Sequence, residues 1–316
     1  DISMDEIREA ASAACLDDTI MNFTQGYETF VGDWLDPNPE KFPHGMGYIA
    51  DEIHKKEYKA GIWLAPFNVQ IKSRIYKEHP DWVIKDADGK PLLGCAGWGG
   101  AYTLDIYNEE AREYIRSFFD VVLNDWGYDM VKLDFLYSQC LYPRNGKSRG
   151  TIMCEAMAFL RECCGDKIIL GCGIVRNEQN ASEYSGKYYN KLGINNEIPS
   201  AQNSIINAMY RRHLNGRAFC SDPDVFFLRY SNLKFNMNQK ILLGGINHIF
   251  GGVLFVSDNA GEYVESDIKA LKLFFSENKS IKVLSVDRAV GDKYVIRIEK
   301  DGKKDVIWFC LKNGFG

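Results

Sequence analysis

The stretch Tyr128-Asp129-Met130-Val131-Lys132-Leu133-Asp134-Phe135 decides the fold class of this chain. Successive side chains of a strand point to opposite faces, so Val131 and Leu133 share an apolar face, whereas Lys132 and Asp134 share the other. Helical patterns precede and follow the stretch, as in a parallel α/β sheet that is covered on both faces. A lysine and an aspartate inside such a sheet cost several kcal/mol unless they pair or line a cavity. We therefore predict that Asp134, at the carboxyl end of the strand, is the catalytic carboxylate. The alternative is a surface strand that ends in a solvated aspartate.

The composition narrows the class of protein. A chain of 316 residues with 46% hydrophobic residues can bury a large core, and its formal charge of -5 with scattered basic residues indicates no nucleic acid or membrane partner. The 9 cysteines show no C-x-x-C spacing, which favours reduced thiols over a disulfide framework or a zinc site. No apolar run reaches about 18 residues, as a membrane span would need. Since the amino end does not look like a signal peptide, we expect a soluble, cytoplasmic protein.

Metal, phosphate and serine-hydrolase chemistry lack their usual signatures. The 5 histidines have no ligand spacing, no glycine-rich phosphate loop is found, and the nucleophile elbow is absent. We therefore expect no cofactor and no metal ion.

Strand and helix patterns alternate through the first 277 residues. The predicted strands are 19–24, 60–66, 128–135, 168–173, 191–195, 217–220 and 248–256. The predicted helices are 7–14, 46–53, 108–122, 151–163, 205–216, 235–244 and 268–275. Between residues 66 and 103 we predict a long loop.

This alternation predicts a (β/α)8 TIM barrel over residues 1–277, with its site at the carboxyl ends of the strands. Only seven strands are counted, so we expect the barrel to lack its first strand. A doubly wound open sheet is the alternative, weakened by the lack of a G-x-G-x-x-G motif after a strand. Residues 278–316 predict a partial C-terminal β domain with antiparallel strands at 282–286, 294–298 and 306–311. Asp301-Gly302 is a hairpin signal between the last two of these strands.

Polar and aromatic side chains follow the predicted strands. Trp63 points away from the face of Ile62 and Leu64, and is expected to share an interior with Lys132. Carboxylates, a lysine and a tryptophan at one mouth are typical of a sugar site, because aromatic faces stack on pyranose C–H surfaces and carboxylates supply acid/base or nucleophilic chemistry. The candidates after the strands are Trp63, Lys132, Asp134, Cys172, Asn195, Asp222, Asp224 and Asp258.

Eight motifs in a fixed order resemble one known family. They are G-D-W at 32–34, K-F-P-x-G-M at 41–46, G-I-W-L-A-P-F at 61–67, H-P-D-W at 79–82, T-L-D at 103–105, K-L-D-F at 132–135, G-C-G at 171–173 and S-D-P-D at 221–224. Over roughly residues 3–277 the chain is similar to the catalytic barrel of the α-galactosidases of glycoside hydrolase family thirty-six, the melibiase group.

The resemblance implies a retaining double displacement on terminal α-galactosides of the raffinose or melibiose type. It assigns the nucleophile to Asp134, sugar hydroxyl contacts to Lys132, a share of the pocket wall to Trp63 and a place near the sugar to Cys172. Retention requires the nucleophile and the acid/base carboxyl to lie about 5–5.5 Å apart. Physical reasoning independently supports the pairing of Lys132 with Asp134, since a nearby cation keeps a partly desolvated carboxylate ionised and ready to attack.

Two departures from the family pattern bear on the chemistry. Family members carry two adjacent aspartates before a Gly-Tyr or Gly-Trp, whereas this chain reads Thr24-Gln25-Gly26-Tyr27, and we expect Asp33 to compensate in part. The acid/base of the family aligns with Asn195, and an amide cannot donate and recover a proton, which typically lowers the rate about 10²- to 10⁴-fold.

Substitutes for the missing acid/base remain open, and so does the activity of the chain. Glu197, Asp222 or Asp224 could act if the segment folds differently, and Asp222 is otherwise expected to bind substrate. Two further functions stay open: an α-N-acetylgalactosaminidase or galactosyl transferase on the same site, and an inactive barrel that binds galactosides or a protein. The partner expected in the main reading is an α-galactoside oligosaccharide, and homo-oligomer formation is left open.

Overall fold

The structure, a computed structural model, describes residues 20–23, 26–172, 201–223, 225–230, 235–256, 258, 260–275 and 281–311. These residues fall into two units, one within residues 18–176 and the other within residues 177–316. Each unit has its own strands, helices and buried apolar side chains.

A four-stranded parallel sheet organises the unit within residues 18–176. In their order across the sheet, its strands are β1 (Ile20–Phe23), β2 (Lys59–Leu64), β6 (Met130–Leu133) and β7 (Ile168–Gly171). All three pairings are parallel, and each strand lies where the sequence predicts one. The α/β class is therefore confirmed. Strand order follows chain order without reversal, which favours the winding of a barrel over a doubly wound sheet, whose order reverses at a switch point.

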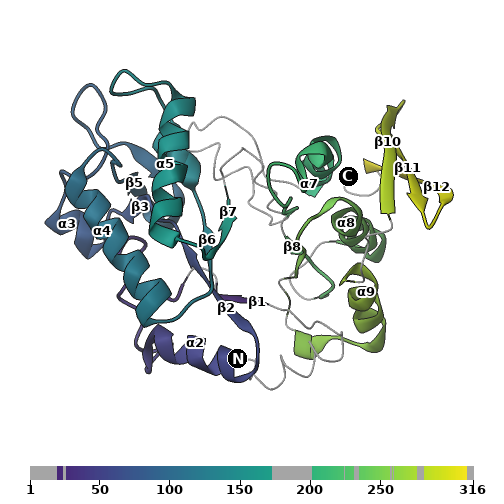
Figure 1. Cartoon of the computed structure of the whole chain (residues 1–316), viewed down its shortest axis with the longest axis horizontal. Helices are drawn as coiled ribbons and strands as arrows, with labels where there is room; N and C mark the ends of the chain where they lie inside the picture. The colour runs from purple at the N-terminus through teal and green to yellow at the C-terminus, as the bar shows by residue number, and fades with distance from the viewer. Residues whose placement is uncertain are drawn as a thin grey trace. The chain divides into compact units, whose positions relative to one another are not determined.

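Three helices connect these strands and cover one side of the sheet. They are α2 (Gly45–Lys55), α4 (Glu109–Asp120) and α5 (Arg149–Cys164). Figure 1 shows α4 and α5 side by side, with α5 next to β6 and β7, and the Arg112 guanidinium of α4 lies 4.0 Å from the centre of the Phe159 ring of α5.

Two local patterns in the sequence correctly predict the start of α4 and the buried face of β6. Asn108 Oδ1 accepts a hydrogen bond from Ala111 N at 3.0 Å, so the predicted N-cap of α4 is confirmed. Val131 and Leu133 are 0% exposed, and the apolar face of the strand at 128–135 is therefore part of the core.

The segment between residues 66 and 103 is not the long loop that the sequence predicts. It holds β3 (Asn68–Gln70), α3 (Arg74–Glu78), β4 (Leu93–Cys95), the 3₁₀ turn η1 (Gly97–Gly99) and β5 (Ala101–Thr103). The strand β5 pairs antiparallel with both β3 and β4, which makes a small second sheet. Strands of three residues offer too few alternating positions for a sequence pattern to reveal them. Two further helical segments follow strands or helices of this unit: the π-helical η2 (Val121–Asp125) and the 3₁₀ turn η3 (Leu136–Cys140).

The unit within residues 177–316 is mostly helical. Its elements before residue 276 are α7 (Ala201–Arg211), η4 (Arg212–Leu214), β8 (Val225–Phe226), α8 (Met237–Phe250), β9 (Phe255–Val256), η5 (Ala260–Glu262) and α9 (Glu265–Phe275). The two strands pair in parallel. All three helices lie where the sequence predicts them, although α8 runs further than expected.

Two strand predictions in this unit are wrong. Residues 217–220 form a turn with one isolated bridge, between Asn215 and Phe219, and the strand of this region is β8 instead. The predicted strand 248–256 is helical up to Phe250, and within it only Phe255 and Val256 pair as a strand. A short apolar run is compatible with a buried helix as well as a strand, and a capping box at Asn236 starts the helix that continues into it.

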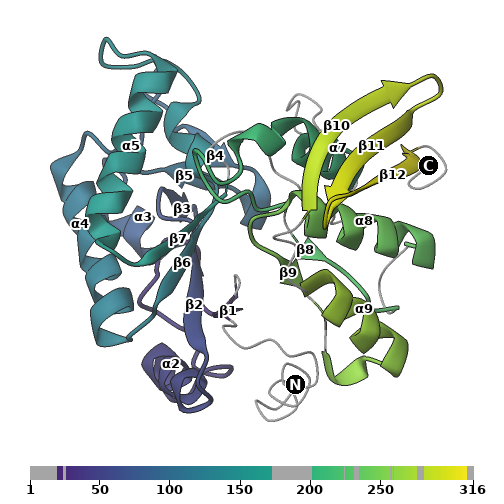
Figure 2. The same ribbon diagram turned by 45° about the vertical axis from the view of Figure 1, so that its right-hand side comes forward.

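The last three strands form an antiparallel sheet in the same unit, as predicted. They are β10 (Ile281–Ala289), β11 (Lys293–Lys300) and β12 (Lys303–Cys310). Asp301 and Gly302 have φ of 51° and 75° between β11 and β12, the two positive values that a tight hairpin of this kind requires. Figure 2 shows the sheet beside α7 and α8, and its buried residues Ile296 and Phe309 belong to the hydrophobic cluster of α7, α8 and α9.

Several sequence predictions lie outside the described residues, among them the helix at 7–14 and the strand at 191–195. In the part of the chain that the structure describes, no helix is both long and apolar enough to cross a bilayer. The eight described cysteines are free thiols, and burial raises the pKa of Cys163 to about 11 and that of Cys164 to about 12. This adjacent pair is therefore protonated and weakly nucleophilic at neutral pH.

Candidate active site

The carboxyl ends of β2, β6 and β7 meet at one edge of the parallel sheet. Trp63 and Lys132 are partners in the register of β2 and β6, as predicted for two residues on one face. Past the strand ends, Asp134 N donates to Leu64 O at 2.8 Å, and Cys172 N donates to Leu133 O at 2.7 Å. Four of the predicted site residues, namely Trp63, Lys132, Asp134 and Cys172, thus lie at the same edge.

Two donors hold the carboxylate of Asp134. The Trp63 indole Nε1 donates to Oδ2 at 3.0 Å, and the backbone N of Phe135 donates to Oδ1 at 2.8 Å. Each oxygen therefore has one fixed donor, and the plane of the carboxylate is set by one group on β2 and one on its own strand end. Such fixation is what a carboxylate that must attack or transfer a proton in one direction needs.

The residue after the carboxylate has an unusual backbone. Phe135 lies in the left-handed region, with φ 54° and ψ 30°, which is uncommon for a bulky residue. Outliers of this kind cluster at functional sites, where the surrounding structure over-determines them. Here the turn directs the Phe135 amide back at Asp134 and starts η3 directly after the strand.

Aromatic rings surround Trp63. Its ring centre lies 5.7 Å from that of Trp34 and 5.9 Å from that of Trp98, and the Trp98 centre lies 5.0 Å from that of Phe135. Trp63 is only 3% exposed, so its visible function in this geometry is the hydrogen bond to Asp134.

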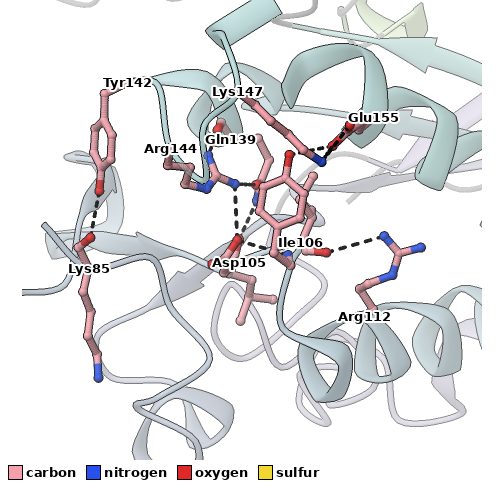
Figure 3. Close-up of polar contacts among 11 residues, drawn as sticks. Lys85, Asp105, Ile106, Arg112, Gln139, Tyr142, Arg144, Lys147 and Glu155 are labelled. Atoms are coloured by element: carbon pink, nitrogen blue, oxygen red, sulfur yellow. Dashed lines mark hydrogen bonds and ion pairs between the residues drawn. The ribbon is translucent and has the colours of Figure 1, made fainter. Parts of the chain in front are cut away.

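The loop after β6 is fixed by a buried arginine (Figure 3). Arg144 Nη2 donates to Gln139 Oε1 at 2.7 Å and to Asp105 Oδ1 at 3.3 Å, and its side chain is 10% exposed. Arg144 Nη1 also donates to the Gln139 carbonyl. Gln139 belongs to η3, and its Nε2 donates to Leu104 O, so this residue joins the loop to the end of β5. We refer to Asp105, Gln139 and Arg144 as the arginine clamp.

A second set of contacts continues from the clamp to α5. Lys147 Nζ donates to both oxygens of Glu155 at 2.8 Å, and the Tyr107 hydroxyl donates to the same carboxylate at 2.6 Å. The Arg144 guanidinium lies 5.1 Å from the centre of the Tyr107 ring, a cation–π distance. Figure 3 shows Lys147, at the end of the loop, pointing toward Glu155 of α5. The loop that follows Asp134 is therefore tied at both of its ends.

Asp33 is placed differently from the other candidates. It is 3% exposed, and its Oδ2 and Oδ1 accept from Arg74 N at 2.8 Å and Ile75 N at 3.0 Å. Both oxygens thus satisfy the free amides at the start of α3. This geometry favours a structural role for Asp33 over the predicted role in sugar binding.

The remaining candidates lie within residues 177–316. Asp222 is half-buried and precedes β8, and it does not follow a strand, since the strand predicted at 217–220 is absent. Asn195 and Glu197 lie outside the described residues, as does Asp224. The predicted roles of these residues stay predictions.

Asp258 is a carboxylate that the protein itself saturates. Its side chain is 0% exposed, and it accepts from Leu228 N at 2.6 Å, Arg229 N at 3.1 Å, Arg229 Nη1 at 2.9 Å and the Tyr263 hydroxyl at 2.8 Å. Four donors on one buried carboxylate indicate a structural site at the end of β9.

Sequence reasoning missed the parts of the site that come from backbone geometry and long-range pairing. Phe135 belongs to a quoted motif, but nothing in the motif signals its left-handed turn. Trp98 stands in G-W-G-G, where the glycines alone hinted at an irregular turn. Arg144 pairs with Asp105 across 39 positions of the chain, beyond any local pattern. Among the described residues, no group of three or more His, Cys, Asp or Glu is arranged to hold a metal ion.

Comparison with known proteins connects this geometry to one family. Residues 7–149 match the family model Melibiase. A galactosaminidase of Flavonifractor plautii that acts on A-type blood α-D-galactosamine is 34% identical over 128 residues, or 37% of this chain and 12% of that protein. The α-galactosidase Mel36A of Lactobacillus acidophilus is 31% identical over 119 residues, or 38% of this chain and 16% of its own length.

Solved structures give the same relation over more of the chain. The α-galactosidase TtGalA of Thermus thermophilus, solved with p-nitrophenyl α-D-galactopyranoside, matches with a TM-score of 0.72 and 26% identity. That match covers 96% of this chain and 63% of TtGalA, so the chain spans less than two thirds of that protein. The α-galactosidase AgaA of Geobacillus stearothermophilus, a member of glycoside hydrolase family thirty-six, shares the fold with a TM-score of 0.62 at 15% identity, over 96% of this chain and 44% of AgaA.

These matches confirm the resemblance seen in the sequence motifs. Residues 7–149 match the melibiase family model, and the chain is similar in sequence and fold to α-galactosidases, one of them a member of glycoside hydrolase family thirty-six.

Proposed function

We propose that this chain is the catalytic part of a retaining glycoside hydrolase that acts on terminal α-galactosides, with Asp134 as the nucleophile. The observation that carries the proposal is the carboxylate of Asp134, held by Trp63 Nε1 and Phe135 N at the carboxyl edge of the parallel sheet. The related TtGalA has been solved with an aryl α-galactoside and with stachyose, which supports the substrate class. The reversal-free strand order and the likeness to TtGalA support a (β/α)8 barrel as the framework.

In the proposed mechanism, Asp134 attacks the anomeric carbon and the leaving group departs with its bonding electron pair. The galactosyl ester that results is hydrolysed by water, which restores the carboxylate and releases galactose with its α configuration. Lys132 lies in register with Trp63 on the same face and contacts sugar hydroxyls in this proposal, with Cys172 at the neighbouring strand end.

The test of the function is hydrolysis by the wild-type chain. We expect release of p-nitrophenol from the aryl α-galactoside, with no release from the aryl β-galactoside or α-glucoside. Proton NMR of the first turnovers is expected to show α-galactose before mutarotation. Inversion, or equal rates on all three glycosides, would contradict the proposal.

The same assays separate the alternative functions. Preference for the aryl α-N-acetylgalactosaminide would indicate an α-N-acetylgalactosaminidase, and galactosyl transfer to added sucrose would indicate a transferase. Galactose binding without any turnover would indicate an inactive binding barrel.

The alignment of Asn195 with the acid/base residue of the family predicts a ratio between the rates on two substrates, an aryl α-galactoside and melibiose. If an amide stands at the acid/base position, substrates with a good leaving group need little protonation, whereas melibiose and raffinose need it fully. We expect kcat/KM for the p-nitrophenyl substrate to exceed that for melibiose by about 10²-fold or more. Asn195→Asp is the matched variant, and it is expected to narrow this ratio by raising the rate on melibiose. An unchanged ratio would reject Asn195 as the occupant of that position.

Trp63→Phe tests the hydrogen bond to Asp134. The variant keeps a ring in the core but removes the Nε1 donor, and a hydrogen bond to a charged group is worth about 1.5–3 kcal/mol, so kcat/KM is expected to fall about 10- to 100-fold. Trp82→Phe is the matched control, because Trp82 Nε1 donates at 2.9 Å to a carboxylate outside the site, that of Glu110. The control is expected to keep its kcat/KM, and equal losses in both variants would reject a specific role for Trp63.

A further inference from the structure

We propose that Trp98 is a further substrate-contacting residue, whose ring forms the accessible aromatic wall of the sugar site beside Asp134. The proposal rests on the proposed function and deepens it. Sequence motifs assign the wall to Trp63, but Trp63 is 3% exposed, whereas Trp98 is only half-buried. Of these two rings, Trp98 is therefore the one that a ligand can reach.

The backbone conformation of Trp98 indicates that this residue has a function in the site. Trp98 has φ 56° and ψ 22° in η1, between β4 and β5, and this left-handed conformation suits glycine. Glycines stand on both sides of it in the sequence, yet the strained position itself carries the largest side chain. A strained bulky residue persists only when the surrounding structure holds it, and such residues cluster at ligand sites.

The turn that carries Trp98 is held in place from a neighbouring strand. Gln70 Nε2, at the end of β3, donates to the Trp98 carbonyl at 2.7 Å, and Gln70 Oε1 accepts from Val31 N at 3.2 Å. Gly100 N closes the turn by donating to Gly97 O at 2.8 Å. The small sheet β3–β5–β4 therefore fixes the position of the Trp98 ring.

The ring of Trp98 contacts both residues that hold Asp134. It meets Trp63 edge-on, with centres 5.9 Å apart and planes at 65°, and meets Phe135 with centres 5.0 Å apart and planes at 69°. Trp63 and Phe135 are the donors to the two oxygens of the Asp134 carboxylate. The ring of Trp98 thus borders the space in which a sugar would present its anomeric carbon to Asp134. An indole face there suits the apolar C–H surface of a pyranose, while the carboxylate and Lys132 provide the polar contacts.

The experiment compares Trp98→Ala and Trp98→Phe with the wild type. Calorimetric titration with galactose and kinetics on p-nitrophenyl α-galactoside are expected to show Kd and KM about tenfold or more higher in Trp98→Ala, the scale of a lost apolar contact in a pocket. The effect on kcat is expected to be smaller, and Trp98→Phe is expected to recover most of the affinity. Trp308→Ala is the control, because Trp308 is 73% exposed on β12 and is expected to leave both constants unchanged.

Footprinting of the unaltered protein gives a second measurement that does not depend on the folding of a variant. Galactose is expected to protect Trp98 from oxidation, read by mass spectrometry of the peptide that contains it, and to leave oxidation of Trp308 unchanged. A wild-type Kd for galactose in Trp98→Ala, or no protection of Trp98, would overturn the inference while the enzyme still cleaves α-galactosides. Binding that depends on Trp98 without any turnover would support the inference and reject the proposed hydrolase. The absence of both galactose binding and turnover in the wild type would overturn both.

Discussion

Asp134→Asn is expected to lower kcat/KM for p-nitrophenyl α-galactoside by at least about 10³-fold, because removing a nucleophile eliminates the covalent pathway and leaves only binding and orientation. An amide has nearly the shape of the carboxylate but cannot form the galactosyl ester. It also presents an NH₂ group to one of two donors, Trp63 Nε1 or Phe135 N, so one of these hydrogen bonds is lost. The loss should appear mainly in kcat, measured alongside a thermal unfolding curve.

Asp129→Asn is the matched control for this variant. Asp129 precedes the same strand at its opposite end, where its Oδ2 accepts from Ala60 N at 2.9 Å and contacts His54 Nε2 at 2.8 Å. We expect this control to lose some stability and to keep its kcat. Equal activities of Asp134→Asn and the wild type would exclude Asp134 as the nucleophile.

Azide gives a chemical test of the same assignment. In Asp134→Gly the face of the anomeric carbon opposite the leaving group is open, so azide can attack there while p-nitrophenolate departs. The expected product is β-galactosyl azide, identified by NMR, with p-nitrophenol release that rises with azide concentration. A product of α configuration, or no dependence on azide, would place the nucleophile elsewhere.

Gly94→Ala is expected to destabilise the unit within residues 18–176 by about 3 kcal/mol, at the upper end of the usual cost of overpacking a core. A Cβ at this position would lie 2.2 Å from Thr103 Oγ1, 2.8 Å from Asn68 Oδ1 and 3.2 Å from Ser138 Cβ. All three side chains are 0% exposed, so they have little room to move. The expected result is a fall of roughly 6–12 °C in the midpoint of thermal unfolding, which calorimetry would measure.

The same substitution is expected to lower activity before the protein unfolds. Gly94 lies on β4, which leads into the turn of Trp98, and Ser138 lies on η3, which follows Asp134. Gly150→Ala is the control, because a Cβ there would meet only Ser148 Oγ at 3.9 Å, near the start of α5. It is expected to be neutral or slightly stabilising. A wild-type unfolding midpoint for Gly94→Ala would mean that β4 packs less tightly than the structure indicates.

The sequence predicts the parts of this fold that local chemistry determines. The stretch 128–135 has a face pattern that favours a strand in a covered sheet, Asn108 is a typical N-cap, and Asp301-Gly302 is a typical hairpin turn. The structure confirms β6 within that stretch, the N-cap and the hairpin. The same rules fail for β3, β4 and β5, which are three residues long and are stabilised by their partners across the small sheet. They fail again at residues 248–250, where the capping box at Asn236 starts a helix that continues through an apolar run suited to either structure.

The candidate site divides in a similar way. Residue type and spacing bring Trp63, Lys132, Asp134 and Cys172 to one edge of the sheet, because parallel strands align their carboxyl ends. The capping function of Asp33 could not be predicted, because it depends on the position of α3, 41 residues further along the chain. The left-handed turns at Trp98 and Phe135 are also tertiary effects, since neither residue prefers that conformation by itself.

The arginine clamp limits how the proposed enzyme can admit a sugar. Gln139 is 0% exposed, and the side chains of Arg144 and Asp105 are 10% and 26% exposed, so breaking the clamp would leave polar groups with little access to water and opening this loop in the folded protein is unfavourable. We therefore expect residues 135–147 to keep one conformation, with amide exchange that is the same in the free and the sugar-bound protein. Any gating that accompanies substrate entry or product release must then come from other segments of the chain.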